Sequence, residues 1–111
     1  MAEPQREPTH HVQGAITHDD IRIITVALVS KMWRDGGINS DENNANFQIM
    51  SKIDANRNGP ILTEQEATKV SEALVLLDAQ LNHGEVDIGN AVVTWEDQPR
   101  VRELAQLFHK S

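Results

Sequence analysis

The sequence contains no cysteine and no tyrosine, and only two tryptophans and two phenylalanines. The absence of cysteine excludes disulfides, thiolate nucleophiles and zinc or iron–sulfur sites held by cysteine. No stretch approaches the ~18 consecutive apolar residues of a membrane-spanning helix, and the opening MAEPQREPTHH lacks the apolar run of a signal peptide. We therefore expect a cytoplasmic protein that neither spans nor enters a membrane.

Positive charge is also scarce, since 10 basic residues stand against 17 acidic ones and give a formal net charge of −7. No segment gathers basic residues into a patch. An acidic surface would repel the phosphate backbone of DNA or RNA. The composition therefore argues against nucleic-acid binding. An acidic surface suits a basic or polar protein partner, or divalent cations, and the charge balance does not choose between them.

A chain of 111 residues has the size of a single domain with one core. Residues 1–17 contain Pro4, Pro8 and Gly14 and show no apolar periodicity, so we predict a flexible, disordered amino-terminal arm. Apolar residues are concentrated in the stretches 21–33, 70–81 and 91–108. We therefore assign the core to a helical domain over residues 18–111.

The first helix of this domain is predicted to follow Thr17 and to stop at Asp35-Gly36-Gly37. Thr17 can cap the helix, and the glycines are typical of a helix end. Apolar residues recur three and four positions apart and predict one buried face: Ile21, Ile24, Leu28 and Met32. We expect this helix to be the central one.

The second predicted helix is shorter and only partly apolar. Asn39 and Glu42 have the spacing of a capping pair, and the helix would run to about Ile53. Phe47, Met50 and Ile53 are expected to face inward, with Ala45 or Ile49 beside them.

The third helix carries the strongest pattern in the sequence. Thr63 and Glu66 form a capping box that opens a helix over residues 64–81. Its inward positions are Ala67, Val70, Leu74, Leu77 and Leu81. Ala73, Val75 and Leu76 carry apolar surface around to a second side, so this helix either lies in the middle of a bundle or contributes to a dimer interface.

The last part of the chain is predicted to end in another helix. Val86 and Ile88 alternate with polar residues and fit either a short extended piece or a helical turn, with a short fifth helix near residues 88–96 as an option. Pro99 suits the first turn of a final helix that runs to about His109. The predicted fold is thus all-α: a single small domain, an irregular or orthogonal bundle of four to five helices.

The turn between the second and third helices has a motif of its own. Asp54, Asn56 and Asn58 place oxygen donors at alternate positions, and Gly59 follows where the chain must turn sharply. This stretch resembles the calcium loop of the EF-hand family. The resemblance implies an EF-hand-like, Ca²⁺-binding module at residues 54–66, with Asp54, Asn56, Asn58 and Glu66 as ligands.

The same residues also suit a plain helix-to-helix corner. Asp, Asn and Gly are the usual residues of tight turns, with Gly59 in the left-handed region and Thr63 capping the next helix. The twelfth loop position is Gln65, where the family has a bidentate glutamate. The corner is the alternative that we favour, and it requires no cofactor.

No serine or histidine lies in a recognisable catalytic context, so we expect no enzymatic activity. We predict instead a protein-binding protein of regulatory or adaptor type that acts through helix surfaces, with a partner of unknown identity or a second copy of the chain. Tryptophan is a preferred anchor of interfaces. The residues that we expect to contact a partner are Trp95, Leu76 and Trp33.

Overall fold

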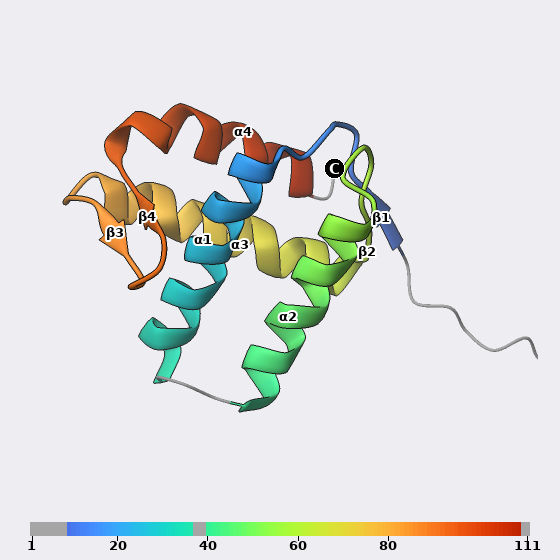
Figure 1. The fold of residues 1–111 in the computed structure, drawn as a ribbon, viewed down its shortest axis with the longest axis horizontal. Coiled ribbons are helices and arrows are strands. Elements are labelled where there is room, and N and C mark those ends of the chain that lie inside the picture. Colours follow the sequence, from blue (N-terminus) through green and yellow to red (C-terminus); the bar gives the residue numbers. More distant parts are fainter. Residues whose placement is uncertain (1–8, 37–39, 110–111) are drawn as a thin grey trace, which may run out of the picture.

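The computed structural model describes residues 9–36 and 40–109. Over these residues the chain is mostly helical, and Figure 1 shows the four α-helices gathered in one body with two small sheets at its margins. The helices are α1 (His18–Gly36), α2 (Ser40–Ala55), α3 (Glu64–Leu81) and α4 (Gln98–Phe108). The strands are β1 (Thr9–His11), β2 (Ile61–Thr63), β3 (Val86–Asp87) and β4 (Val92–Val93), and a 3₁₀ turn, η1, spans Trp95–Asp97. The predicted four helices are confirmed, whereas the two antiparallel sheets were not expected.

Helix α3 lies between α1 and α4 and contacts both. The predicted inward residues of α3 are all buried: Ala67, Val70, Leu74, Leu77 and Leu81. The predicted capping box also forms, since the Thr63 hydroxyl accepts from the Glu66 N–H at 3.1 Å and the Glu66 carboxylate accepts from the Thr63 N–H at 2.9 Å. Local sequence signals therefore define both the start and the buried face of this helix.

Helix α1 is buried on more than one side. The buried apolar residues along it are Ile23, Ile24, Val26, Ala27, Leu28 and Met32, while Ile21 is half-buried. A helix that is apolar around most of its circumference needs cover from several elements. Contacts from α2, α3, β3 and β4 supply this cover, which fits the central position predicted for α1.

The predicted flexible arm is wrong for residues 9–17, and residues 1–8 lie outside the described part of the chain. Strand β1 pairs antiparallel with β2, with His10 opposite Leu62. Val12 and Ile16 are 1% and 2% exposed and belong to the core. The backbone N–H of Val12 donates to Pro60 O at 2.9 Å. The pairing partners lie far along the sequence, so no local periodicity could reveal them.

The turn between α2 and β2 also differs from the predicted geometry. Gly59 is not among the described glycines with positive φ. A Cβ atom at Gly59 would lie 3.0 Å from Nε2 of His11, so the close approach of strand β1 explains the small residue. The glycine therefore serves the packing of β1 on the corner rather than a left-handed turn.

Residues 86–97 form a hairpin and a single 3₁₀ turn rather than a fifth α-helix. Val86 pairs with Val93 and Asp87 with Val92. Asp87 Oδ1 accepts from the Gly89 N–H at 2.7 Å, and Gly89 has a φ of 101°, a conformation that side-chain-bearing residues rarely adopt. Of the two alternatives for this stretch, the short extended piece is confirmed at Val86, while Ile88 lies just after the strand and donates its N–H to Ala91 O.

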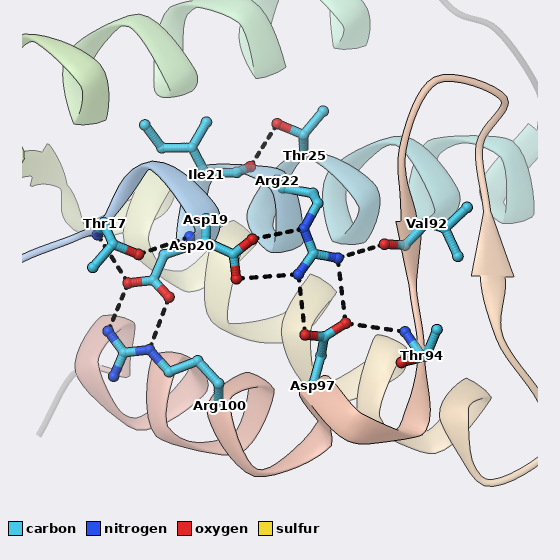
Figure 2. A network of polar contacts seen from close by, with 10 residues as sticks. All are labelled: Thr17, Asp19, Asp20, Ile21, Arg22, Thr25, Val92, Thr94, Asp97 and Arg100. Carbon is cyan, nitrogen blue, oxygen red and sulfur yellow. Dashed lines mark hydrogen bonds and ion pairs between the residues drawn. The ribbon is translucent and has the colours of Figure 1, made fainter.

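A polar network holds the first turn of α1 against α4 (Figure 2). Asp20 is 2% exposed and accepts hydrogen bonds from Nε and Nη2 of Arg100, at 2.8 and 2.6 Å. Thr17 and Asp20 also cap α1 reciprocally through their side chains and backbone N–H groups. Burial raises the pKa of Asp20, but the hydrogen bonds from Arg100 and Thr17 outweigh it and keep the pKa below its ordinary value.

The neighbouring residue Arg22 connects α1 to η1 and β4 (Figure 2). Its guanidinium donates to Asp97 at 3.0 and 3.2 Å, to Asp19 and to the carbonyl of Val92. Asp97 also accepts from the Thr94 N–H at 3.1 Å. The hydrogen bond from Arg22 lowers the pKa of Asp97 from its ordinary value, with burial opposing.

Replacement of Arg100 by leucine is expected to lower the free energy of unfolding by about 3 kcal/mol or more, because it leaves the buried Asp20 carboxylate without its cation. The matched control is Arg102→Leu on the same helix. Arg102 pairs with Asp78 at the surface, with its own side chain 63% exposed, and its loss should cost at most about 1 kcal/mol. Urea unfolding compares the two variants, and equal losses would contradict a special role for Asp20 and Arg100.

The unfolding free energy is also expected to fall as the pH drops below about 4. Asp20 and Asp97 have folded-state pKa values below the ordinary value of 3.8. They therefore contribute stability above the unfolded pKa, which is lost as the pH falls through the folded pKa. Urea titrations at pH 5 and pH 2 measure the loss. Asp97→Asn should reduce the difference between the two pH values, and an unchanged difference would show that Asp97 does not contribute.

Candidate functional site

A groove of about 600 Å³ lies between α1 and α2, which follow one another as an antiparallel pair (Figure 1). We call it the α1–α2 groove. Its lining residues are His18, Ile21, Thr25, Leu28, Val29, Asn43, Asn46, Phe47, Met50, Ser51 and Asp54. Its volume lies within the range of roughly 300–1,000 Å³ that is typical of ligand pockets.

Each helix contributes one face to this groove. The lining residues on α1 run from His18 to Val29 and those on α2 from Asn43 to Asp54, mostly three or four positions apart. At a rise of 1.5 Å per residue each face is about 16 Å long. Thr25 Oγ1 lies 3.9 Å from Met50 Sδ across the middle of the groove. The groove is therefore about three helical turns long.

Helix α2 places a polar residue inside and an aromatic residue outside at adjacent positions. Asn46 is 5% exposed, whereas Phe47 is 73% exposed. The prediction that Phe47 faces the core is therefore wrong, while Ile49 and Ile53 are buried. The apolar residues of α2 are divided between the core face and the groove face, and this division made the inward face ambiguous in the sequence.

The Asn46 carboxamide has no hydrogen-bond partner within the described protein. Both Nδ2 and Oδ1 are shielded from solvent. A buried polar group without a partner costs about 1–3 kcal/mol, and most buried polar groups in native proteins are satisfied. An exposed phenylalanine beside a buried, unpartnered amide departs from the usual pattern of apolar residues inside and polar residues outside. Such departures concentrate at functional sites.

One end of the groove carries its polar and charged residues. His18, Ser51 and Asp54 line this end and are all exposed. Among the described side chains, no hydrogen bond joins His18 to Ser51 or Asp54, and Asp54 instead pairs with Arg57 at 3.3 Å. A serine nucleophile needs a base within hydrogen-bonding reach and a third group that orients the base. In this conformation the three side chains therefore lie at one end of the groove without a serine–histidine hydrogen bond between them.

The structure does not bring the predicted partner-contacting residues into one patch. Trp95 is 70% exposed in η1, which Arg22 holds near the start of α1 through Asp97. Trp33 is 43% exposed and lies about 16 Å beyond Arg22 along the axis of α1. Leu76 is half-buried on α3, and none of the three residues lines the α1–α2 groove. Their role in partner binding stays a prediction.

The predicted calcium ligands are held by other contacts. Asn56 Nδ2 donates to Gly59 O at 3.0 Å, and the Glu66 carboxylate accepts from Thr63 N–H and from Lys52 Nζ, the latter at 2.7 Å. Burial raises the pKa of Glu66, but the hydrogen bonds from Lys52 and Thr63 outweigh this effect. The pKa therefore lies below its ordinary value, and the carboxylate is ionised at neutral pH. Calcium binding at residues 54–66 stays a prediction, and both of these contacts to Glu66 are made by the same oxygen, Oε1.

Over residues 9–36 and 40–109, no three histidine, aspartate or glutamate side chains lie together as a metal site would need. In the same part of the chain, no helix combines the length and the apolar character needed to cross a membrane. Comparison of the chain with protein-family models, with curated proteins and with solved structures finds no match. The groove between α1 and α2 therefore has to be interpreted from its own residues.

Replacement of Asn46 by leucine is expected to raise the free energy of unfolding by about 1–2 kcal/mol, because it removes a buried amide that lacks a partner. The matched control is Asn43→Leu, which makes the same change on an exposed groove position of the same helix. The control should stay within about 0.5 kcal/mol of the wild type. Urea unfolding of both variants decides the matter. If Asn46→Leu is no more stable than the control, the amide is satisfied in solution.

Proposed function

We propose that this chain is a non-enzymatic protein-binding domain, of adaptor or regulatory type, that receives its partner in the α1–α2 groove. The observation that carries the proposal is the arrangement of two adjacent residues on α2. The polar Asn46 is buried without a hydrogen-bond partner, and the apolar Phe47 is exposed over an apolar groove. Exposed aromatic side chains beside a concave apolar surface are typical anchors of protein interfaces.

The charge of the protein supports a partner with a basic or neutral contact surface. The net charge is −7, and none of the described residues that line the groove is lysine or arginine. A matching positive partner would be steered toward the domain and an acidic one would be repelled. Asp54 is the one carboxylate among the described residues of the lining, so any salt dependence of binding should trace partly to it.

The proposal is tested by charge substitutions on exposed apolar residues. Phe47→Glu should remove a bound partner, because it places a carboxylate at the edge of an apolar contact. The matched control is Val75→Glu on α3, since Val75 is also largely exposed but does not line the groove. Partner proteins captured from the source cells are compared for the wild type and both variants after circular dichroism shows that all three are folded. We expect at least a tenfold loss of captured partner with Phe47→Glu and little change with Val75→Glu.

Two results would contradict the assignment of the groove. Unchanged capture by Phe47→Glu would remove it as the docking surface. Loss of capture by Trp95→Glu, with Phe47→Glu unaffected, would move the interface to the η1 region, where Trp95 is exposed.

A further inference from the structure

The walls of the α1–α2 groove limit what kind of peptide can occupy it. Both walls are α-helices, whose backbone N–H and C=O groups are already paired within each helix except at the ends. An extended segment lying there would lose water from its own backbone and find no sheet edge in return. A helical segment satisfies its backbone internally, so the groove favours a helix over a strand.

The dimensions of the groove agree with a short helix. The lining on each wall spans about 16 Å, which equals about three turns of α-helix. An amphipathic helix presents apolar residues at i, i+3 or i+4 and i+7 over this distance. Ile21, Val29 and Met50 are half-buried and offer the apolar surface for such side chains, with Phe47 at the edge.

The unpartnered amide specifies the chemistry at the centre. Asn46 has two donors on Nδ2 and an acceptor on Oδ1, and neither atom has a partner in the described protein. A carboxylate offers only acceptors and an ammonium group only donors. A hydroxyl offers a donor and acceptors on one atom, whereas a second carboxamide, from glutamine or asparagine, has them on two atoms and can pair with Asn46 through two hydrogen bonds.

Pairing with the Asn46 amide requires neighbouring side chains to move. In this conformation both polar atoms are shielded from solvent, and half-buried Met50 lines the groove one turn along α2. Methionine is unbranched and changes rotamer at low cost, so it can make room for an incoming side chain.

The charge at one end of the groove adds a second preference. Asp54 lies in the last turn of α2, where the helix dipole is negative. Its pair with Arg57 is exposed, with 62% of the Asp54 side chain accessible, and can exchange for another cation. A basic residue near the matching end of the occupant would complement this site.

From these constraints, and resting on the proposed function, we infer that the occupant is a three-turn amphipathic helix of a partner protein. It carries a carboxamide that pairs with Asn46, at a position about one turn inside the Asn43 end of the groove that we call the central position, and a basic residue at the end near Asp54.

The experiment is a display selection with helical peptides in which four groove-facing positions are randomised. The baits are wild type, Asn46→Leu and Phe47→Glu. The wild type should enrich glutamine or asparagine at the central position and lysine or arginine near one end. Asn46→Leu should enrich an apolar residue at the central position, and Phe47→Glu should enrich no sequence.

Affinity of a selected peptide then measures the amide pair. Replacing its central carboxamide by leucine should weaken binding to the wild type about tenfold, as expected for two hydrogen bonds between neutral groups. The same replacement should not weaken binding to Asn46→Leu. Fluorescence anisotropy of labelled peptides gives both values.

Three results would overturn the inference. One is that wild type and Asn46→Leu enrich the same residue at the central peptide position, which would mean that the Asn46 amide binds water and not the peptide. A second is no enrichment by the wild type, and a third is a wild-type dimer in light scattering that Phe47→Glu makes monomeric. If no peptide is enriched while Phe47→Glu still loses a captured cellular partner, the proposed function stands and only the helical occupant fails.

Discussion

The apolar residues of α1 and α3 cover more of each helix than a single neighbouring helix can bury, and the rest of the structure supplies the missing cover. Helix α3 is covered by α1 on one side and α4 on another, while α1 is further covered by α2 and by the β3–β4 hairpin. Strand β1 and the residues after it add Val12 and Ile16 to the same core. The two short sheets thus serve mainly to place cover on a helical centre.

Ion pairs fix how this cover is attached. The buried carboxylate of Asp20 is both a cap of α1 and the anchor of Arg100 on α4, so helix start and helix packing depend on one side chain. Arg22, two residues further along α1, holds η1 and β4. A buried carboxylate is costly without its partner, so this arrangement makes the relative position of α1 and α4 specific.

Helix α2 is the exception to full cover, and the candidate site follows from it. Ile49 and Ile53 are buried in the core, whereas Asn46, Phe47 and Met50 line the groove, with Asn46 buried and Phe47 exposed. Moving Phe47 inward and an amide outward would satisfy ordinary packing better. The occupant that we propose for the groove would contact both residues.

The helices could be predicted from the sequence because their signals are local. These signals depend on residues within a few positions of each other: the capping box of Thr63 and Glu66, the spacing of Val70, Leu74 and Leu77, and Pro99 at the start of α4. Only the tertiary structure decided the pairing of β1 with β2 and the burial of Val12. It also decided the meeting of Asp20 with Arg100 and the side of α2 on which Asn46 lies. These features join residues that are distant in the chain, so local patterns do not reveal them. The sequence alone also does not tell whether an apolar residue such as Phe47 lies in the core or on a binding surface, because that depends on its neighbours in space.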